Sequence, residues 1–281
     1  MSLSYSNLPV YVGGANSSTI GEATRYVPAI DANVSFSSSA GAKRNLGQSV
    51  DSTDQFKFQG PRTANISFKF ILDTTFGTSH NQFLNDANQS AFFPVEIGNN
   101  LYKNTYLSNY SVSISPFQPV TVAANFVSMN PPSGDAIKQD TAPYGGDDIP
   151  FNSDGVIYGY TCSVGNMDDV VGNVQSQINY TKEYTRTPVY TLGSTNAETM
   201  LLDSVESSMN ITSTGLENSI DYSGDKLASD VSVGLQDIDG TAYPFIGTLT
   251  MAAGARVLTT NYSVNGGDTV VTTAEIKQID L

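Results

Sequence analysis

The strongest constraint on the fold is a pair of alternating runs on either side of a proline-containing turn. Residues 110–114 alternate Tyr, Val and Ile with serines, and residues 120–126 alternate apolar side chains with Thr, Ala and Asn. This two-residue period indicates strands that bury one face. Between the runs, residues 115–119 include two prolines, which remove two backbone donors and end the strand pairing. We therefore predict a β-hairpin near 106–127 with one apolar and one hydroxyl-rich face.

Composition extends this prediction to the whole chain. Only 14% of the 281 residues are charged, against about 25% in a typical domain, and Ser, Thr, Asn, Gly and Tyr fill the difference. This balance is typical of all-β proteins with many turns, and it lacks the Ala, Glu, Lys and Leu bias of helical proteins. We predict an all-β fold with minor helix, a β-sandwich or half-barrel, in a chain long enough for two domains.

Weak internal repeats indicate that the fold is present twice. Residues 32–47 align without gaps on residues 178–193, Asn65-Ile66-Ser67 aligns on Asn210-Ile211-Thr212, and the hairpin aligns on a second one at 243–263. Three matches in the same order favour duplication, although alternation alone could produce each of them. The predicted organisation is an N-terminal arm (1–27), a first β domain (28–130), a linker or loop (131–155) and a second β domain (156–281).

Two segments carry helix signals within this β-rich chain. Residues 79–88 form a polar stretch with Ser79 available as an N-cap. Residues 195–208, in the second copy, also read as helical. We expect a short helix in each copy.

No residue pattern predicts catalysis, a metal site or a cofactor. His80 is the only histidine and Cys162 the only cysteine, so a His/Cys metal cluster and an intrachain disulfide are both excluded. Asp237-Ile238-Asp239-Gly240 copies the opening of a calcium loop but lacks the distal Glu, so we predict a hairpin turn there. Nucleotide-binding and hydrolase motifs are absent. We expect no enzyme activity, no cofactor and no metal. Because no run of eighteen apolar residues occurs, we also expect no membrane insertion of the subunit.

The net charge of −14 limits how the chain could meet nucleic acid. Lys and Arg carry the affinity of proteins for phosphates, and this chain has few of them. Tight binding of DNA or RNA is therefore not expected. Repulsion from nucleic acid, which a conduit for DNA would need, remains compatible with the charge.

Three ordered groups of residues between Tyr26 and Met129 carry a family resemblance. They are Tyr26-Val27-Pro28 followed by a strand and KRNLG at 43–47; then DQFKFQGPRTANIS at 54–67; and finally FPVEIGNNLY at 93–102, YLSNYSV at 106–112 and SPFQPV at 115–120. Each piece is degenerate, and their order carries the likeness. In this order they resemble bacteriophage tail tube proteins, although the chain is about twice as long as a minimal tube subunit.

The resemblance implies a structural virion protein of a viral tail. Such subunits close into rings with a continuous inner β-barrel, and the rings stack into the tube through which the genome is ejected. The fold is similar to that of contractile injection system tubes and baseplate hubs. The implied partners are further copies of the chain, with sheath, baseplate and tail terminator proteins as additional candidates. DNA would pass without specific binding. The implied location is the virion tail, after synthesis in the host cytoplasm.

Assembly and class both leave alternatives open. Two tandem copies per chain favour a trimeric ring with pseudo-sixfold symmetry, and a hexamer is the alternative. A baseplate hub, a head-tail adaptor or a receptor-binding β-sandwich module could use a similar fold. The sequence leaves open whether the tail is contractile and which hairpin face lines the lumen.

The candidate site residues fall into two groups. Those expected on the lumen or ring hairpins are Ser111, Ser113, Ser115, Thr121, Asn125, Thr248, Thr250, Thr259 and Asn261. Those expected at contacts between subunits are Val10, Tyr11 and Val12, in an arm whose strand would pair outside its own domain, and Arg256, which we expect beside a carboxylate.

Overall fold

The computed structural model describes residues 10–18, 26–43, 56–74, 82–97, 100–129, 153–171, 175–194, 196–214, 226–265 and 269–280. These residues are mostly β-strand, and the longest helix among them, α1 (Asp168–Val171), has four residues. The prediction of an all-β fold with minor helix is therefore confirmed.

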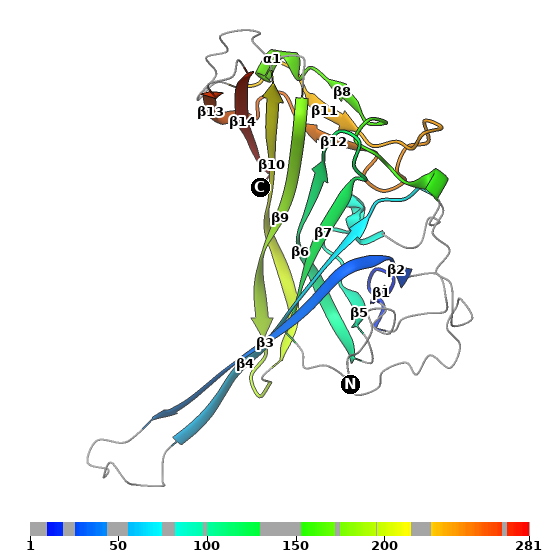
Figure 1. Ribbon diagram of the computed structural model, residues 1–281. Coiled ribbons are helices and arrows are strands. Elements are labelled where there is room, and N and C mark those ends of the chain that lie inside the picture. Colours follow the sequence, from blue (N-terminus) through cyan, green and yellow to red (C-terminus); the bar gives the residue numbers. More distant parts are fainter. Residues whose placement is uncertain are drawn as a thin grey trace.

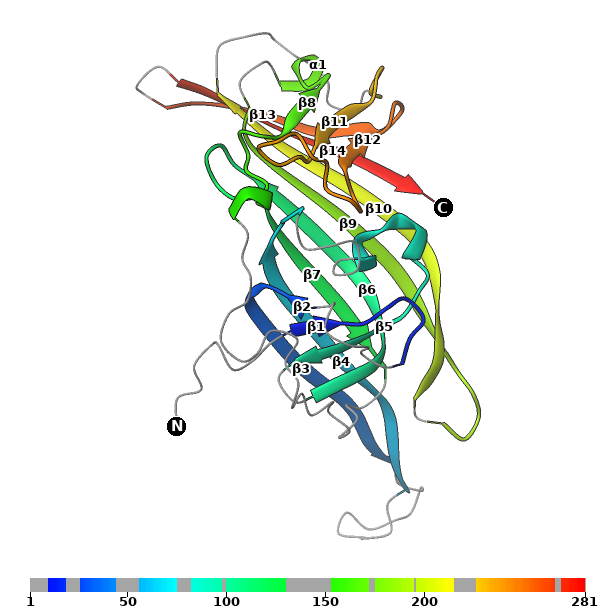
Figure 2. The ribbon, with the colours of Figure 1, turned by 90° about the vertical axis from the view of Figure 1, so that its right-hand side faces the viewer.

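Eight antiparallel strands lie side by side in one continuous sheet (Figures 1 and 2). In spatial order they are β3 (Ala29–Lys43), β4 (Phe56–Ile71), β7 (Thr121–Ser128), β6 (Asn100–Ile114), β9 (Gln175–Tyr190), β10 (Ala197–Thr214), β14 (Thr269–Asp280) and β13 (Arg256–Asn265). The β3–β4 hairpin extends beyond its neighbours at the lower left of Figure 1. The sheet passes from the first part of the chain to the second through the pairing of β6 with β9.

The sheet forks at β6. The first residues of β6 pair with β5 (Phe93–Ile97), which pairs with β1 (Val10–Val12), which in turn pairs with β2 (Tyr26–Val27). All three residues of β1 are buried. The run at 10–12 therefore completes the core of its own chain, where an arm reaching another domain was predicted.

Short elements cover one face of the sheet. A three-stranded sheet, β8 (Ser163–Gly165), β11 (Val231–Gly234) and β12 (Thr248–Met251), lies over β10 and β14 together with α1 (Figure 2). The 3-10 turns η2 (Gln82–Leu84) and η3 (Asp86–Asn88) lie over the first half, and η4 (Ser153–Gly155) follows the residues left undescribed after β7. The core fills the space between the sheet and these covering elements.

Alternation explains which face is covered. Burial alternates along all of β7, with Val122, Ala124 and Phe126 buried and their neighbours partly exposed. Phe126 stacks on Phe68 of β4, with ring centroids 5.6 Å apart, and meets Phe83 of η2 edge-on at 5.4 Å. Because side chains of a strand point alternately to opposite faces, burying these rings leaves the hydroxyl-bearing residues on the other face. The predicted hairpin is confirmed, with β6 and β7 joined by the proline turn.

Three sequence predictions need correction. Residues 195–208 were expected to be helical, but the described part from 197 belongs to β10. This strand pairs with β9 from Ala197 and with β14 from Val205, and the pairing overrides the local helix preference. The second hairpin is β13–β14 and not 243–263, because β12 pairs with β11 in the covering sheet. In the described part of the 79–88 segment the expected helix takes the form of two short 3-10 helices, η2 and η3, and Ser79 and His80 lie outside the described residues.

The two halves of the sheet share one strand order. β3–β4 followed by β7 and β6 matches β9–β10 followed by β14 and β13. The tetrapeptide Asn-Tyr-Ser-Val occupies 109–112 in β6 and recurs at 261–264 in β13. The two asparagines of this tetrapeptide occupy matching positions in the two halves. Ser67 and Asn109 both pair with Asn125 of β7, and Thr212 and Asn261 both pair with Thr273 of β14. The predicted domain boundaries stay a prediction, since most of 131–155 lies outside the described residues.

Candidate functional site

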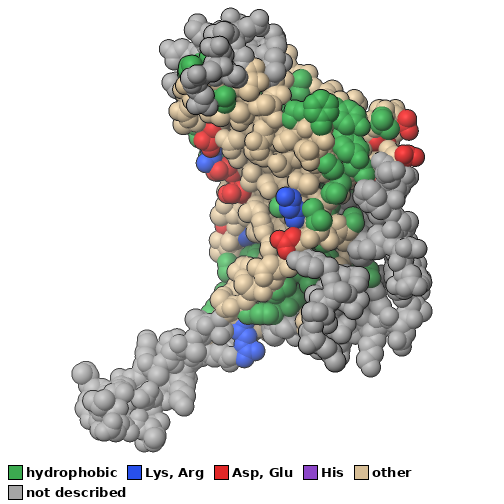
Figure 3. Space-filling model, viewed as in Figure 1, with side chains coloured by type: hydrophobic (Ala, Val, Ile, Leu, Met, Phe, Trp, Pro, Cys, Tyr) green, Lys and Arg blue, Asp and Glu red, His purple; other side chains and the backbone are tan. Residues whose placement is uncertain are grey.

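The uncovered face of the eight-stranded sheet is polar. Strand register sets side chains of successive strands in rows across it, and one row runs through six strands: Thr121, Ser113, Asn179, Asn210, Glu275 and Thr259. All six side chains are partly or fully exposed. Figure 3 views the sheet from the side and not straight onto this face; uncharged polar side chains and backbone occupy much of the described surface in that view. The face thus offers hydroxyl and amide groups to whatever lies against it.

Charges on this face are few and partly neutralised. We consider this row and the next two rows on one side of it, which pass through Ser111 and Asn109 of β6. Their acidic residues are Asp31, Glu183, Glu206 and Glu275, and their basic residues are Lys69, Lys277 and Arg256. Lys277 Nζ lies 2.6 Å from Glu206 Oε1. The hydrogen bond to Glu206, together with the nearby carboxylates of Glu275 and Glu183, raises the pKa of Lys277. This ammonium is therefore held by carboxylates and is a poor anchor for phosphate.

The structure brings most of the candidate lumen residues onto this one face. Ser111, Ser113, Thr121, Asn125, Thr259 and Asn261 all point to it by register. Ser115 lies in the turn after β6. Thr248 and Thr250 do not join them, because β12 belongs to the covering sheet on the opposite side.

The joint between the two halves is a strand pairing with a buried apolar side. β6 and β9 pair from Asn109↔Glu183 to Ile114↔Ile178, and Val112 stands opposite Tyr180. Val112 and Tyr180 are buried. The Tyr110 ring lies 6.3 Å from that of Tyr180. Burial, followed by the neighbouring tyrosines, raises the pKa of Tyr110 well above its ordinary range, so this phenol stays neutral.

Two cations of β9 reach back across the joint into the first half. Lys182 Nζ lies 2.5 Å from the carboxylate of Asp86 in η3. Arg186 donates from Nε to the carbonyl of Leu107 at 3.0 Å and from a terminal nitrogen to the carbonyl of Gln89. Burial lowers the pKa of Arg186. Sequence reasoning missed both cations, because their partners lie far away in the chain.

Arg186 also lies over two aromatic rings. Its guanidinium carbon is 5.4 Å from the ring centre of Tyr106 and 5.6 Å from that of Tyr184. Cation–π contacts of this kind add to the hydrogen bonds when they are shielded from water. The β6–β9 joint is thus held by pairing, apolar burial and charge together.

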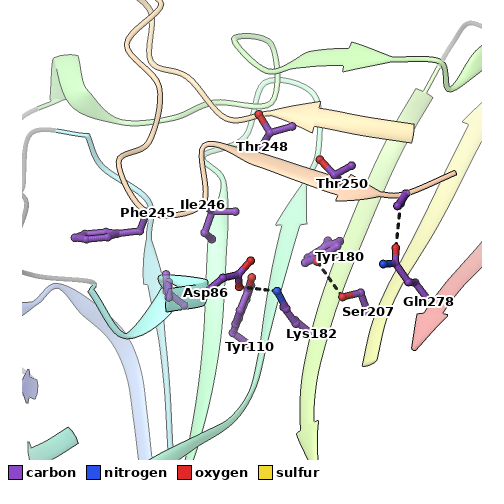
Figure 4. Close-up of a pocket in the computed structure, with 12 residues that line it drawn as sticks. Asp86, Tyr110, Tyr180, Lys182, Ser207, Phe245, Ile246, Thr248, Thr250 and Gln278 are labelled. Carbon is purple, nitrogen blue, oxygen red and sulfur yellow. Dashed lines mark hydrogen bonds and ion pairs between the residues drawn. The ribbon is translucent and has the colours of Figure 1, made fainter. Parts of the chain in front are cut away.

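A cavity of about 320 Å³ lies beside the joint, between the sheet and its cover (Figure 4). Tyr110, Tyr180, Lys182 and Ser207 line it from the sheet, and Asp86 faces Lys182. Tyr180 donates its hydroxyl to Ser207 at 3.2 Å. Lys182 with Asp86 and Tyr180 with Ser207 are thus already engaged, and the cavity is a polar space between the two halves.

The eight-stranded part of the sheet ends in two edges, β3 and β13, each paired on one side only among the described strands, and the fork ends separately at β2. Exposed apolar side chains mark both edges: Phe36 of β3 is 60% exposed, and Tyr262 and Val264 of β13 are 50% and 72% exposed. Arg256, predicted at a subunit contact, is the first residue of β13. Its backbone lies opposite Lys277 of β14 and forms a β-bridge with Lys226. Unpaired edges of this kind invite another strand.

The remaining candidates occupy ordinary structural positions. Asp237 accepts backbone hydrogen bonds from Asp239 and Thr241, which confirms the predicted turn. Cys162 is half-buried, and burial raises its pKa to about 11. Within the described ranges no group of three or more His, Cys, Asp or Glu residues could hold a metal ion. None of the described helices has both the length and the apolar character that a membrane span requires.

The chain matches no protein-family model and no curated protein.

Proposed function

We propose that this protein is the structural subunit of a bacteriophage tail tube, in which copies form rings that stack into a conduit for genome ejection. The observation that carries the proposal is the β6–β9 joint, where one half of the chain adds to the other by strand pairing. Each half begins with one hairpin, β3–β4 or β9–β10, and ends with a second, β6–β7 or β13–β14, so the same joint can be repeated between chains. Among the described strands, β3 and β13 each have a free edge at which a joint with another chain could form.

Repetition of this joint favours closure into a ring. A head-to-tail contact either closes or grows as an open helix, and closure removes the edges. Three chains would supply about 24 strands, which at ~4.8 Å spacing and a tilt of ~40° give a barrel roughly 45–50 Å across between backbones. A trimer thus offers the wall of a wide tube, and a hexamer is the alternative.

We assign the polar face to the lumen. The covering elements occupy the other face, so in a closed ring they would lie outside the wall. Ser, Thr and Asn side chains with a slight acidic excess offer a passing duplex no array of cations to grip. DNA would therefore move through without specific binding. Sheath, baseplate and terminator partners in the virion belong to the same proposal.

Negative-stain microscopy of the purified protein tests the proposal. We expect filaments of indefinite length with a central channel and three-fold or pseudo-sixfold cross-sections. Single rings that do not stack would favour a hub or an adaptor, and a protein that stays monomeric at high concentration would contradict the tube.

A further inference from the structure

We infer that β13 of one chain pairs antiparallel with β3 of the next, in the register that sets Val264 opposite Phe36 and Ser263 opposite Ser37. The inference rests on the proposed function in taking a second copy as the partner. It goes further by naming the two edges and the residues that meet.

The register follows from the joint within the chain. In β6–β9, Ser111 pairs with Thr181 and Val112 pairs with Tyr180. The repeated Asn-Tyr-Ser-Val segment places Ser263 and Val264 of β13 where β6 has Ser111 and Val112.

The matching positions of β3 follow from the long hairpins. Ile178 of β9 pairs with Ile211, and Val34 of β3 pairs with Ile66, the sequence equivalent of Ile211. Counting two and three residues onward from Ile178 and from Val34, Tyr180 and Thr181 correspond to Phe36 and Ser37. This equivalence is set by the strand pairing, and it is shifted by two residues from the sequence alignment of 32–47 on 178–193, which would put Tyr180 on Val34. The pairs in β6–β9 thus translate directly to β13–β3.

Burial supports the same register. Val112 and Tyr180 are buried at the internal joint, whereas their equivalents Val264 and Phe36 are exposed at 72% and 60%. Both equivalents point to the covered, apolar face of the sheet. Pairing the edges would bury these two exposed side chains against each other, as the internal joint already does for their counterparts.

Strand direction also fits a head-to-tail contact. The eight strands alternate in direction, so β13 and β3 run in opposite senses at the two ends of the sheet. Joining β13 to β3 of the next copy is therefore antiparallel and keeps the polar face on one side. Pairing β3 with β3 would instead be a two-fold contact that leaves both β13 edges open.

Disulfide trapping between separate chains tests the register. The background is Cys162→Ser, because this half-buried thiol is the only native cysteine. Four single-cysteine chains are made: Phe36→Cys, Ser37→Cys, Val264→Cys and Ser263→Cys. Directly opposed residues of antiparallel strands have Cα atoms about 4.5–5.5 Å apart, within the range for a disulfide.

The four chains give two matched and two mismatched mixtures. We expect oxidation to link Phe36→Cys with Val264→Cys, and Ser37→Cys with Ser263→Cys, shifting the band from 29.9 kDa to twice that mass. The mixtures Phe36→Cys with Ser263→Cys and Ser37→Cys with Val264→Cys should stay unlinked, because a one-residue shift puts the thiols on opposite faces. Each chain alone should also stay unlinked. The Ser37/Ser263 pair keeps the test valid if replacing Phe36 impairs folding.

A double variant tests closure. Phe36→Cys/Val264→Cys in one chain cannot bond internally, since seven strand spacings of ~4.8 Å separate the two edges by roughly 30 Å along the sheet. We expect an oxidised ladder that ends at three chains. Filaments without the matched disulfide links would overturn the proposed register but would not contradict the proposed tube function. Matched links without filaments would support the register and count against the tube, and the absence of both would overturn both.

Discussion

Glu96 should make the stability of this protein fall as pH rises. The residue lies on β5 opposite Tyr11 of β1 and Leu101 of β6, and it is only 2% exposed. Its Oε2 atom has no hydrogen-bond partner among the described residues. Burial raises the pKa of this carboxyl from 4.5 to about 7.

The sign follows from proton binding. Between pH 4.5 and about pH 7 the folded protein keeps a proton on Glu96 that the unfolded chain has lost. The free energy of unfolding therefore decreases across this window and levels off above it. A pKa difference of this size corresponds to roughly 3 kcal/mol at most.

Urea unfolding of the wild type and Glu96→Gln measures the effect. Glutamine keeps the shape of the side chain without a titrating group, so its stability should lack this component of the pH dependence. We expect the variant to gain up to ~3 kcal/mol over the wild type between about pH 4 and pH 8, or ~1 M in the urea midpoint at an m-value of ~3 kcal/mol/M. A difference between the two proteins that stays constant with pH would refute this account.

Two further predictions concern contacts between the halves. Arg186→Met should destabilise the fold by about 2–4 kcal/mol in urea unfolding, because it leaves the partly buried carbonyls of Leu107 and Gln89 without their charged donor. Lys182→Met is the matched control and should cost only ~1 kcal/mol, since Asp86 is solvent-exposed; equal losses in the two variants would contradict the reasoning. Gly159→Ala should lower the thermal midpoint, at a cost of about 2–3 kcal/mol, because its Cβ would stand 2.1 Å from the carbonyl oxygen of Ser115. An unchanged midpoint would mean that the backbone there yields freely.

The sequence alone determined the faces of the strands. Alternation in 110–126 and the prolines at 116 and 119 define the hairpin, its turn and its apolar side, because the two-residue period of a strand is a local property. The same period places Ser111, Ser113 and Asn125 on the polar side without reference to any strand partner. Low charge and abundant Ser, Thr and Asn likewise predicted an all-β chain.

Partner choice was decided only by the tertiary structure. Residues 197–208 contain good helix formers but become a strand because β9 pairs with them, and β14 joins from Val205 on. The short run Val10–Val12 joins β5 because that edge lies within its own chain. Lys182 and Asp86 meet across 96 residues of sequence. Such contacts depend on which strands become neighbours, a choice made by the packing of the whole core and not by any local pattern.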